Sequence, residues 1–366
     1  MDSGIRVIRI ANVQKGYIED NTPAFYPLET NELDRYMLEE GDLLMSLTGN
    51  VGRVAILKKE FMPAALNQRV ACLRLKTDRI TKDYLFHVLN SDFFEQQCIQ
   101  SSKGVAQKNM STEWLKDYEI PMYSKEQQES IAYILDKTKN IIISQNHELQ
   151  KLDNLIKARF VEMFGDMYLN SKGWSEAKLE SMADVVSGIT KGRKTKSEDL
   201  TEVPYMAVSN VKDGYIDWTT VKTIEATQQE IEQYRLLADD VLMTEGGDPD
   251  KVGRGAIIKE PLENCIHQNH IFRVRLDESV VLPEFFAEYL QHQRSKRYFL
   301  GCAKQTTGIA SINMTQLRAL PVLMPPLSRQ EEFVLFKAQV NKSKVIDTNI
   351  IPRGGFYNGN EFCISK

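Results

Sequence analysis

An internal repeat constrains this 366-residue chain more than any other feature of its sequence. The segment 8–19 returns as 206–217, with Asn12 opposite Asn210 at an offset of 198 residues. The offset grows to 204 toward the end of each copy, as small insertions in loops would produce. The later matches that we assign are Asp42 with Asp240, 51–53 with 252–254, 67–70 with 268–271, Cys98 with Cys302, Asn109 with Asn313, Pro121 with Pro325 and Ser124 with Ser328. Two copies of one domain are therefore expected.

The residue pattern within each copy predicts both strands and helices. Runs of β-branched residues at 6–10, 70–75 and 271–276 are bounded by Gly, Asn and Asp, and they predict strands. Amphipathic stretches at 82–100 and 283–300 predict helices. The expected fold class is α+β, with two tandem mixed α/β domains.

A heptad pattern separates the two copies. Apolar residues recur every seven positions after Ser124, which predicts one long helix of coiled-coil type. Ser124 and Gln127 form a capping-box pattern at its start, and Ser328 with Glu331 repeats that pattern. A helix of roughly 40 residues is about 60 Å long, so its stripe needs a partner, either a spacer helix or the helix's own domain. The stripe, which we predict to be a subunit interface, contains Leu135, Ile142, Leu149, Ile156 and Met163.

These patterns divide the chain into four expected parts. The first domain covers 1–122 and is incomplete, because about 30 residues from Gly173 to Val203 precede the repeated segment only in the second copy. The spacer helix covers 123–168, and the second domain covers 169–326. Residues 327–366 begin a second, shortened helix and end in a divergent tail with Pro and Gly-Gly, which stop helices.

Charge and cysteine usage limit the class of protein. There are 46 Lys and Arg against 50 Asp and Glu, a net charge of -4, so a nucleic-acid surface has to be a local patch. The five cysteines form no Cys-x-x-Cys pair, which favours a reducing cytosol over a disulfide scaffold or zinc module. Without a signal-peptide pattern or a long apolar run, a cytoplasmic location is expected.

Motifs for enzyme chemistry are missing from the sequence. It contains no G-x-x-x-x-G-K-[ST] phosphate loop, no glycine-rich dinucleotide motif, no H-E-x-x-H and no Asn-Pro-Pro-aromatic cluster. Asp250 stands alone, whereas two-metal chemistry needs several carboxylates. His267 and His270 are three residues apart, but no further ligand completes a zinc site. We predict a non-enzymatic protein without catalytic, cofactor or metal-binding residues.

An ordered set of motifs runs through the first copy and the helix that follows it. It comprises Gly104-x-x-Gln107-x-Asn109-Met-Ser, then Ile120-Pro121, Ile-Ala-x-x-Leu-Asp at 131–136, and Leu-x-x-Leu-Ile-Lys-x-Arg-Phe-x-x-Met-Phe-Gly-Asp at 152–166. Together with the duplication, this order resembles the specificity (S) subunit of type I restriction-modification systems. The resemblance covers residues 6 to about 344.

The resemblance implies two target-recognition domains, each reading one half of a bipartite site in double-stranded DNA. It also implies paired spacer helices that dock the modification (methyltransferase) subunits, with the ATP-dependent restriction subunit joining for cleavage. The S subunit itself has no catalytic activity in that family. Two alternatives stay open, a truncated silent or inactive specificity cassette and a duplicated protein-binding scaffold. The unpaired stripe further predicts self-pairing through the spacer helix.

Four groups of residues are candidates for DNA contact. The basic loop 188–196 suits phosphates, and the varying turns that end in Arg53 and Arg254 suit phosphate or guanine. Amides near 67–69 and 268–270 can bind adenine. Two loops that contain small residues, 103–109 and 306–313, can let the backbone approach DNA. Each group has a structural alternative as a solvated loop, an internal salt bridge, a turn or a helix cap. The predicted DNA-binding residues are Thr48, Asn50, Arg53, Asn67, Gln68, Arg69, Lys103, Gln107, Lys108, Lys191, Arg193, Lys194, Lys196, Lys251, Arg254, Gln268, Asn269, His270, Thr307 and Ser311.

Overall fold

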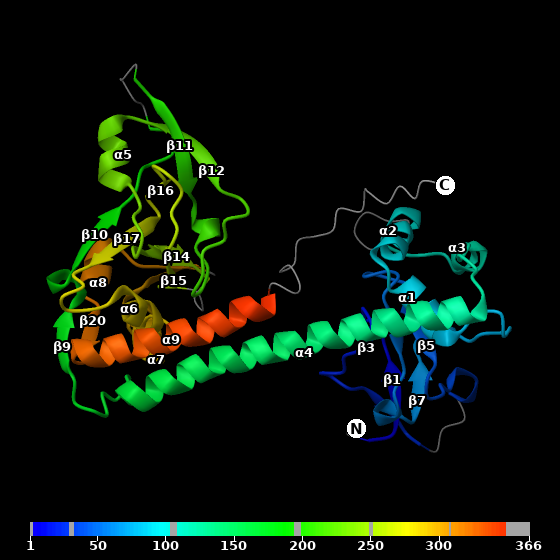
Figure 1. The fold of residues 1–366 in the computed structure, drawn as a ribbon. Helices are drawn as coiled ribbons and strands as arrows, with labels where there is room; N and C mark the ends of the chain where they lie inside the picture. Colours follow the sequence, from blue (N-terminus) through cyan, green and yellow to red (C-terminus); the bar gives the residue numbers. More distant parts are fainter. Residues whose placement is uncertain are drawn as a thin grey trace. The chain divides into compact units, whose positions relative to one another are not determined.

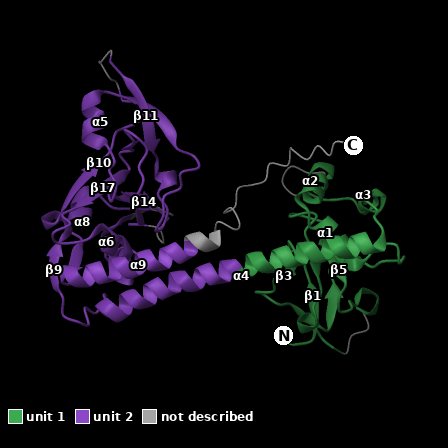
Figure 2. Cartoon of the chain, viewed as in Figure 1, with its two compact units in different colours: residues 1–144 green, residues 145–366 purple. Residues whose placement is uncertain are grey.

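The computed structural model describes residues 3–28, 33–102, 108–193, 199–248, 252–306 and 309–348 (Figure 1). The chain divides into two compact units, residues 1–144 and 145–366, and the boundary falls within the 40-residue helix α4 (Lys125–Phe164) (Figure 2). A mixed α and β architecture with one long central helix confirms the expected fold class. The finer division into four parts stays a prediction.

Unit 1 contains two three-stranded sheets and a short hairpin. In one sheet β1 lies between antiparallel β4 and parallel β7, and in the other β5 lies between antiparallel β6 and β8. Strands β2 and β3 form the hairpin. The elements are β1 (Ile5–Ile8), β2 (Val13–Gln14), β3 (Tyr17–Ile18), β4 (Phe25–Tyr26), β5 (Leu43–Ser46), β6 (Val54–Ile56), β7 (Ala64–Leu66), β8 (Val70–Leu73), α1 (Lys82–Leu89), α2 (Asp92–Ser101) and α3 (Thr112–Asp117), with 3-10 turns at Asp34–Tyr36 and Lys59–Phe61.

Unit 2 repeats both sheets and adds strands. Strand β11 lies between antiparallel β12 and parallel β16, and β13 lies between β15 and β17. Strand β10 extends the second sheet beyond β17, β9 pairs with β20, and β14, β19 and β18 form a small sheet. The elements are β9 (Ser175–Lys178), β10 (Ala183–Ser187), β11 (Thr201–Met206), β12 (Lys222–Ala226), α5 (Gln228–Tyr234), β13 (Val241–Thr244), β14 (Gly246–Gly247), β15 (Gly255–Ile257), β16 (Ile266–His267), β17 (Ile271–Leu276), α6 (Pro283–Tyr289), α7 (Gln293–Cys302), β18 (Lys304–Thr306), β19 (Ile309–Ser311), α8 (Met314–Arg318), β20 (Pro321–Met324) and α9 (Leu327–Thr348), with 3-10 turns at Leu179–Ser181 and Val208–Asn210.

Matching hydrogen bonds confirm the repeat at its first marker. The Asn12 side chain accepts from Arg9 N–H at 2.8 Å and donates to Glu19 O at 2.9 Å. The Asn210 side chain makes the same two bonds, to Ala207 N–H and Asp217 O, each at 2.9 Å. Both asparagines are buried. Each amide therefore links the backbone before its hairpin to the backbone after it from inside the protein.

A buried carboxylate with a bidentate arginine also occurs in both units. Arg74 donates to both oxygens of Asp42 at 2.7 and 2.6 Å, and Arg275 does the same to Asp240 at 2.7 and 2.8 Å. Burial alone would raise the pKa of Asp42, but the hydrogen bonds from Arg74 hold it below its ordinary value. Asp42 and Asp240 directly precede strands β5 and β13. Their arginine partners lie near the ends of the neighbouring strands β8 and β17, so each pair joins two adjacent strands of the sheet.

A buried glutamine at the start of each long helix is a third common feature, and the sequence comparison missed it. Gln128 accepts from Thr81 N–H at 2.8 Å and donates to Arg79 O and Tyr123 O. Gln330 accepts from Leu282 N–H at 2.9 Å and donates to Val280 O and Pro325 O. Both side chains are fully buried.

These glutamines correct the late part of the predicted alignment. They lie 202 residues apart, so Ser124 corresponds to Pro326 and not to Ser328, and Pro121 corresponds to Leu323 and not to Pro325. The Ser124–Gln127 capping box is confirmed, with bonds of 3.0 and 3.3 Å. The second predicted box is wrong, because α9 begins at Leu327 and the N–H groups of Arg329 and Gln330 donate to Pro326 O.

Helix caps shift two further matches. Ser111 caps α3 and Asn313 caps α8, so these two correspond and Asn109 does not match Asn313. Helices α2 and α7 begin after Ser91 and His292, an offset of 201 that places Cys98 opposite Phe299 and not opposite Cys302. Each predicted single helix, 82–100 and 283–300, is in fact two helices, because a new cap interrupts the run.

Within unit 2, α9 packs antiparallel on the second half of α4. Arg159 pairs with Glu332 at 2.9 Å, and Asp153 pairs with Lys344 at 2.5 Å. Phe160, Phe164, Phe333 and Val340 lie in one buried core with the sheet residues (Figure 1). The antiparallel partner that the heptad stripe required is thus present for this part of α4.

Candidate nucleic-acid interface

Polar side chains gather in unit 2 where the end of β13 meets the start of β17. Glu245 N–H donates to His270 O at 3.0 Å, and Ile312 N–H donates to Glu245 O at 2.8 Å, which ties both strand ends to the segment after β19. A hollow of about 320 Å³ opens here, lined by Val208, Glu245, Gly246, His270 and Ser311. We call Gly246, Gln268, His270 and Ser311 the polar corner of unit 2.

Unit 1 builds the same place from different residues. Leu47 N–H donates to Arg69 O at 3.0 Å, and Met110 N–H donates to Leu47 O at 2.9 Å, the same two bonds as in unit 2. Thr48 pairs with Asn109, as Gly246 pairs with Ser311. The polar corner of unit 1 is Thr48, Asn67, Arg69 and Asn109.

The two corners bring together six of the predicted DNA-contacting residues, which lay in two separate segments of each copy. They are Thr48, Asn67 and Arg69 in unit 1 and Gln268, His270 and Ser311 in unit 2. Asn109, Glu245 and Gly246 were missed. The sequence held a signal for Asn109, because an offset of 202 places it opposite Ser311, but the incorrect match to Asn313 concealed it.

Side chains in the corners differ in how far they are already occupied. Asn67 Oδ1 accepts from Arg69 N–H at 3.2 Å, and Gln268 Oε1 accepts from Val208 N–H at 3.4 Å, and neither NH2 group has a hydrogen-bond partner among the residues that the structure describes. Arg69 is exposed. His270 is exposed too, with Nδ1 at 2.5 Å from a carboxylate oxygen of Glu245.

The two neighbouring amides lie differently. Gln68 is exposed, and Asn269 is half-buried. Asn269 N–H donates to Ile189 O at 3.0 Å, and its carbonyl accepts from the Ser187 hydroxyl at 2.7 Å. The backbone of Asn269 therefore joins β17 to the strand beside it.

The turns that end in arginine are built into the hairpins. Ser46 N–H donates to Arg53 O at 3.0 Å, and Thr244 N–H donates to Arg254 O at 3.1 Å. The Arg53 guanidinium donates to the Gln14 side chain, whereas the buried Nε of Arg254 has no hydrogen-bond partner among the described residues. Asn50 is exposed on the tip of its turn. A DNA contact by either arginine stays a prediction.

Arg193 in the basic loop already has an internal partner. It donates to both oxygens of Glu230 at 2.6 Å, and these side-chain hydrogen bonds lower the pKa of Glu230 to about 2. Lys191 is exposed, and so is Lys108, whose carbonyl accepts from Gly49 N–H at 2.9 Å. Outside the described residues lie Lys103, Gln107, Lys194, Lys196, Lys251 and Thr307.

The predicted interface stripe on α4 changes its burial along the helix. In unit 1, Leu135 and Ile142 expose 43% and 39% of their surface. In unit 2, Leu149 is half-buried, and Ile156 and Met163 are buried in the core shared with α9. Ile156 and Met163 are thus covered by their own chain, and the exposed residues keep the prediction of a subunit interface.

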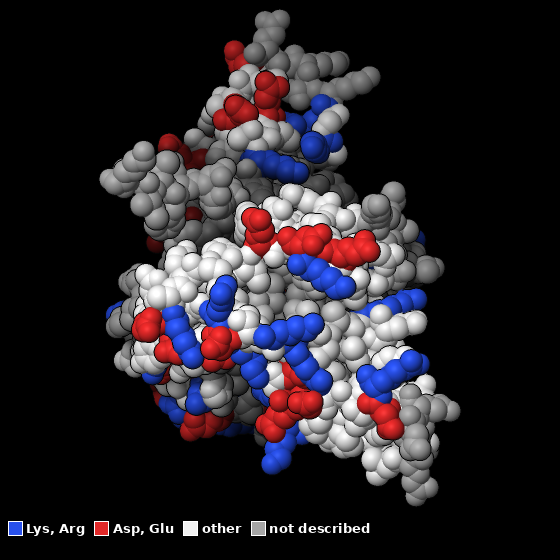
Figure 3. Space-filling model, turned by 90° about the vertical axis from the view of Figure 1, so that its right-hand side faces the viewer, with Lys and Arg blue, Asp and Glu red and all other residues white. Residues whose placement is uncertain are grey.

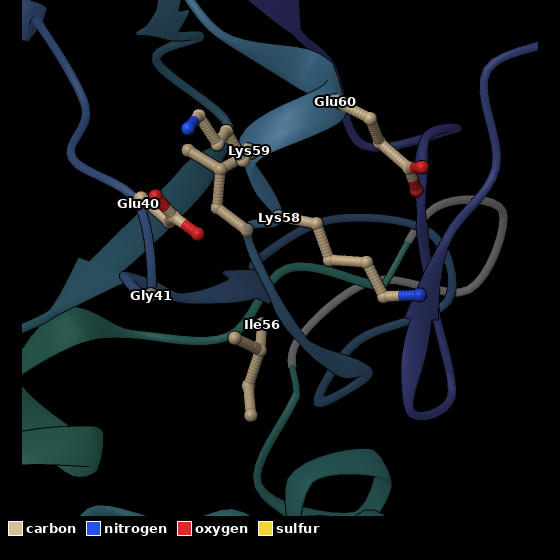
Figure 4. Close-up of a pocket in the computed structure, with 7 residues that line it drawn as sticks. Glu40, Gly41, Ile56, Lys58, Lys59 and Glu60 are labelled. Atoms are coloured by element: carbon tan, nitrogen blue, oxygen red, sulfur yellow. The ribbon is translucent and has the colours of Figure 1, made fainter.

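Charge and cavities limit what these surfaces can do. Figure 3 shows Lys and Arg interspersed with Asp and Glu on one face, so phosphate contacts would depend on a few cations. A hollow of about 650 Å³ in unit 1 is lined by charged residues that include Glu40, Lys58, Lys59 and Glu60. In Figure 4 these side chains spread apart and do not converge on one point, which is unlike a substrate site.

Two absences concern only the residues that the structure describes. No helix there is long and apolar enough to cross a membrane. No group of three or more His, Cys, Asp or Glu lies together there in a way that could hold a metal ion. His267 is buried between Tyr234 O and Val186 O, and burial lowers its pKa to about 4, so the imidazole is neutral at pH 7.

Comparison with known proteins places the chain in a family. Residues 2–154 and 171–348 match the type I restriction modification DNA specificity domain. The specificity subunit of the type I restriction enzyme EcoKI from Escherichia coli is 21% identical over 347 residues, covering 91% of this chain and 74% of that protein. The StySPI specificity subunit from Salmonella potsdam is 23% identical over 348 residues, with the same coverage.

Solved structures show the same fold. A type I restriction-modification S subunit from M. genitalium matches with a TM-score of 0.54 and 15% identity, covering 95% of this chain and 87% of that one. A chain from a study of the assembly and conformational transition of a type I restriction-modification system matches with a TM-score of 0.55 and 15% identity, covering 94% and 86%. With two matched segments that span most of its length, the chain belongs to the family of type I restriction-modification DNA specificity subunits.

Proposed function

We propose that each unit reads one half of a bipartite double-stranded DNA target through its polar corner. The supporting observation is that both corners share the same backbone hydrogen bonds but carry different polar side chains. Two readers of unlike sequences need this combination, because the frame fixes the approach to DNA and the side chains select the bases. The proposal favours a specificity subunit over a protein-binding scaffold.

The chemistry of each corner suits the edges of base pairs. Arg69 can donate two hydrogen bonds to guanine, and the NH2 groups of Asn67 and Gln268 suit an acceptor such as adenine N7. His270 can donate or accept, depending on which ring nitrogen carries the hydrogen. Lys108 and Lys191 lie on exposed loops, where they can contact phosphates without selecting a sequence.

The chain itself then acts by positioning other proteins. Modification (methyltransferase) subunits and ATP-dependent restriction subunits would perform the chemistry, and the exposed part of the α4 stripe would bind a partner or a second copy. This role needs no catalytic residue in the chain.

The test is co-expression with the neighbouring modification subunit in a host without DNA methylation, followed by mapping of N6-methyladenine. We expect a bipartite asymmetric motif. Arg69→Ala should relax only one half of that motif and His270→Ala only the other, while Lys76→Ala, an exposed cation outside the corner, should change neither. A motif unchanged by both corner variants would refute the assignment. No methylation beside an intact, active S subunit would indicate an inactive cassette.

A further inference from the structure

The polar corners of the two units differ in one side-chain contact. In unit 2, Glu245 and His270 lie opposite each other just beyond the paired strands β13 and β17, and a carboxylate oxygen of Glu245 lies 2.5 Å from His270 Nδ1. In unit 1, Leu47 and Arg69 occupy these two places, and the N–H of Leu47 donates to the facing carbonyl at 3.0 Å exactly as that of Glu245 does. Because the frame uses only the backbone of this position, the Glu245 carboxylate is not needed to build the corner.

The contact with Glu245 determines which nitrogen of the His270 ring carries the hydrogen. An ionised carboxylate can only accept hydrogen bonds, so the Nδ1 atom that faces it has to be the donor. A neutral imidazole has one N–H, and its other nitrogen is then an acceptor. In His270 that acceptor is Nε2, which has no hydrogen-bond partner among the residues that the structure describes.

The His270 ring also lies where a ligand can reach it. Its side chain exposes 55% of its surface, whereas the Glu245 side chain exposes 34%. Both residues line the hollow of about 320 Å³, and Gly246 and Ser311 form the adjacent strand pair of that hollow. The less exposed carboxylate thus supports the more exposed ring from within the corner.

The corresponding residue of unit 1 has the opposite hydrogen-bonding character. The Arg69 guanidinium carries five N–H donors and no acceptor, so it suits the O6 and N7 acceptors of guanine. An acceptor at His270 needs a donor on the base instead. In the major groove, the base donors are the amino groups at adenine N6 and cytosine N4.

We propose that Glu245 holds His270 in the Nδ1–H tautomer, so that Nε2 accepts a hydrogen bond from a base amino group, adenine N6 or cytosine N4, in the half-site of unit 2. Glu245 is then a positioning residue that determines specificity through His270 without contacting DNA itself. The proposal rests on the proposed function, because it takes DNA to be the ligand of the corner. The state of the ring, however, can be measured without DNA.

The first arm of the test measures the tautomer in the full chain by NMR of ¹⁵N-labelled histidine. The nitrogen shifts distinguish the Nδ1–H, Nε2–H and doubly protonated rings, and comparison with His270→Asn identifies the signals of His270. We expect the Nδ1–H form in the wild type. Glu245→Leu, which introduces the residue of unit 1, should shift the ring toward the Nε2–H form that predominates in free histidine. The control Glu278→Leu, at an exposed carboxylate just after β17, should leave the ring unchanged.

The second arm measures binding of the chain, with its modification subunit, to duplexes that carry the mapped methylation motif. In the half-site that His270→Ala relaxes, single bases lose either the amino group (purine for adenine, 2-pyrimidinone for cytosine) or N7 (7-deazaguanine, 7-deazaadenine). Loss of the amino group at one position should weaken binding by the wild type roughly fivefold, the effect of one hydrogen bond. The same loss should not weaken binding by His270→Ala or Glu245→Leu further. Loss of N7 there should affect the wild type and His270→Ala equally.

The outcomes separate this inference from the proposed function. An Nε2–H or doubly protonated His270 ring in the wild type, at the pH of the binding assay, would overturn the inference alone. A half-site that depends on His270 through N7 and not through an amino group would do the same, because His270 would then be a donor. A motif that His270→Ala leaves unchanged would overturn both the inference and the assignment of unit 2 as a DNA reader through this corner.

Discussion

Replacing the buried Gln330 tests whether the long helices are attached to their units by side-chain amides. Two of its three hydrogen bonds, at 2.9 and 3.1 Å, join the start of α9 to the segment before α6, and the third, at 2.9 Å, is donated to Pro325 O just before α9. Each such bond contributes roughly 1 kcal/mol, and a buried group left unsatisfied adds to the loss. Gln330→Met keeps the volume, so we expect unit 2 to lose about 2–4 kcal/mol of stability.

The assay is unfolding in urea, with hydrogen–deuterium exchange of peptides from α1 and α6 as the readout. One peptide reports on each unit, because the two units need not unfold together. Gln330→Met should shift only the α6 transition, and Gln128→Met should shift only that of α1. Gln150→Met, on the exposed face of α4, is the matched control and should stay within about 0.5 kcal/mol. A loss below that limit for both buried glutamines would refute the reasoning.

Two further predictions follow from local geometry. Gly253→Ala should lower the free energy of unfolding by about 2–4 kcal/mol, because φ is +70° and a Cβ would lie 2.1 Å from the Phe299 ring. The control is Gly173→Ala, which has φ +65° but open space around the Cβ and should cost only about 1 kcal/mol. Thermal unfolding of both variants compares the two losses. The pKa of Glu230 is lowered from 4.5 to about 2, so its pair with Arg193 stabilises unit 2 above pH 4.5 and this stability is lost as the pH falls toward 2. Stability measured at pH 6 and pH 3 should therefore differ less in Glu230→Gln than in the wild type; an equal difference would contradict the prediction.

The sequence alone was sufficient for the duplication, the mixed α and β composition and the long helix. Asn12 and Asn210 match because each side chain accepts from one backbone N–H and donates to one backbone carbonyl, a combination that a short amide side chain can supply. The heptad stripe predicts α4 because apolar periodicity is a local property of the chain. These features leave a signal in the order of residues.

Only the tertiary structure established which residues correspond toward the ends of the two copies and which residues form the candidate sites. The equivalence of Gln128 with Gln330 depends on carbonyl groups about 50 residues away in the chain, and no local pattern marks them. Ser111 and Asn313 perform the same capping with different residue types, so identity of letters misled the alignment. The polar corners arise from strand pairing between distant segments, and the free energy of that pairing is determined by the whole fold rather than by neighbouring residues.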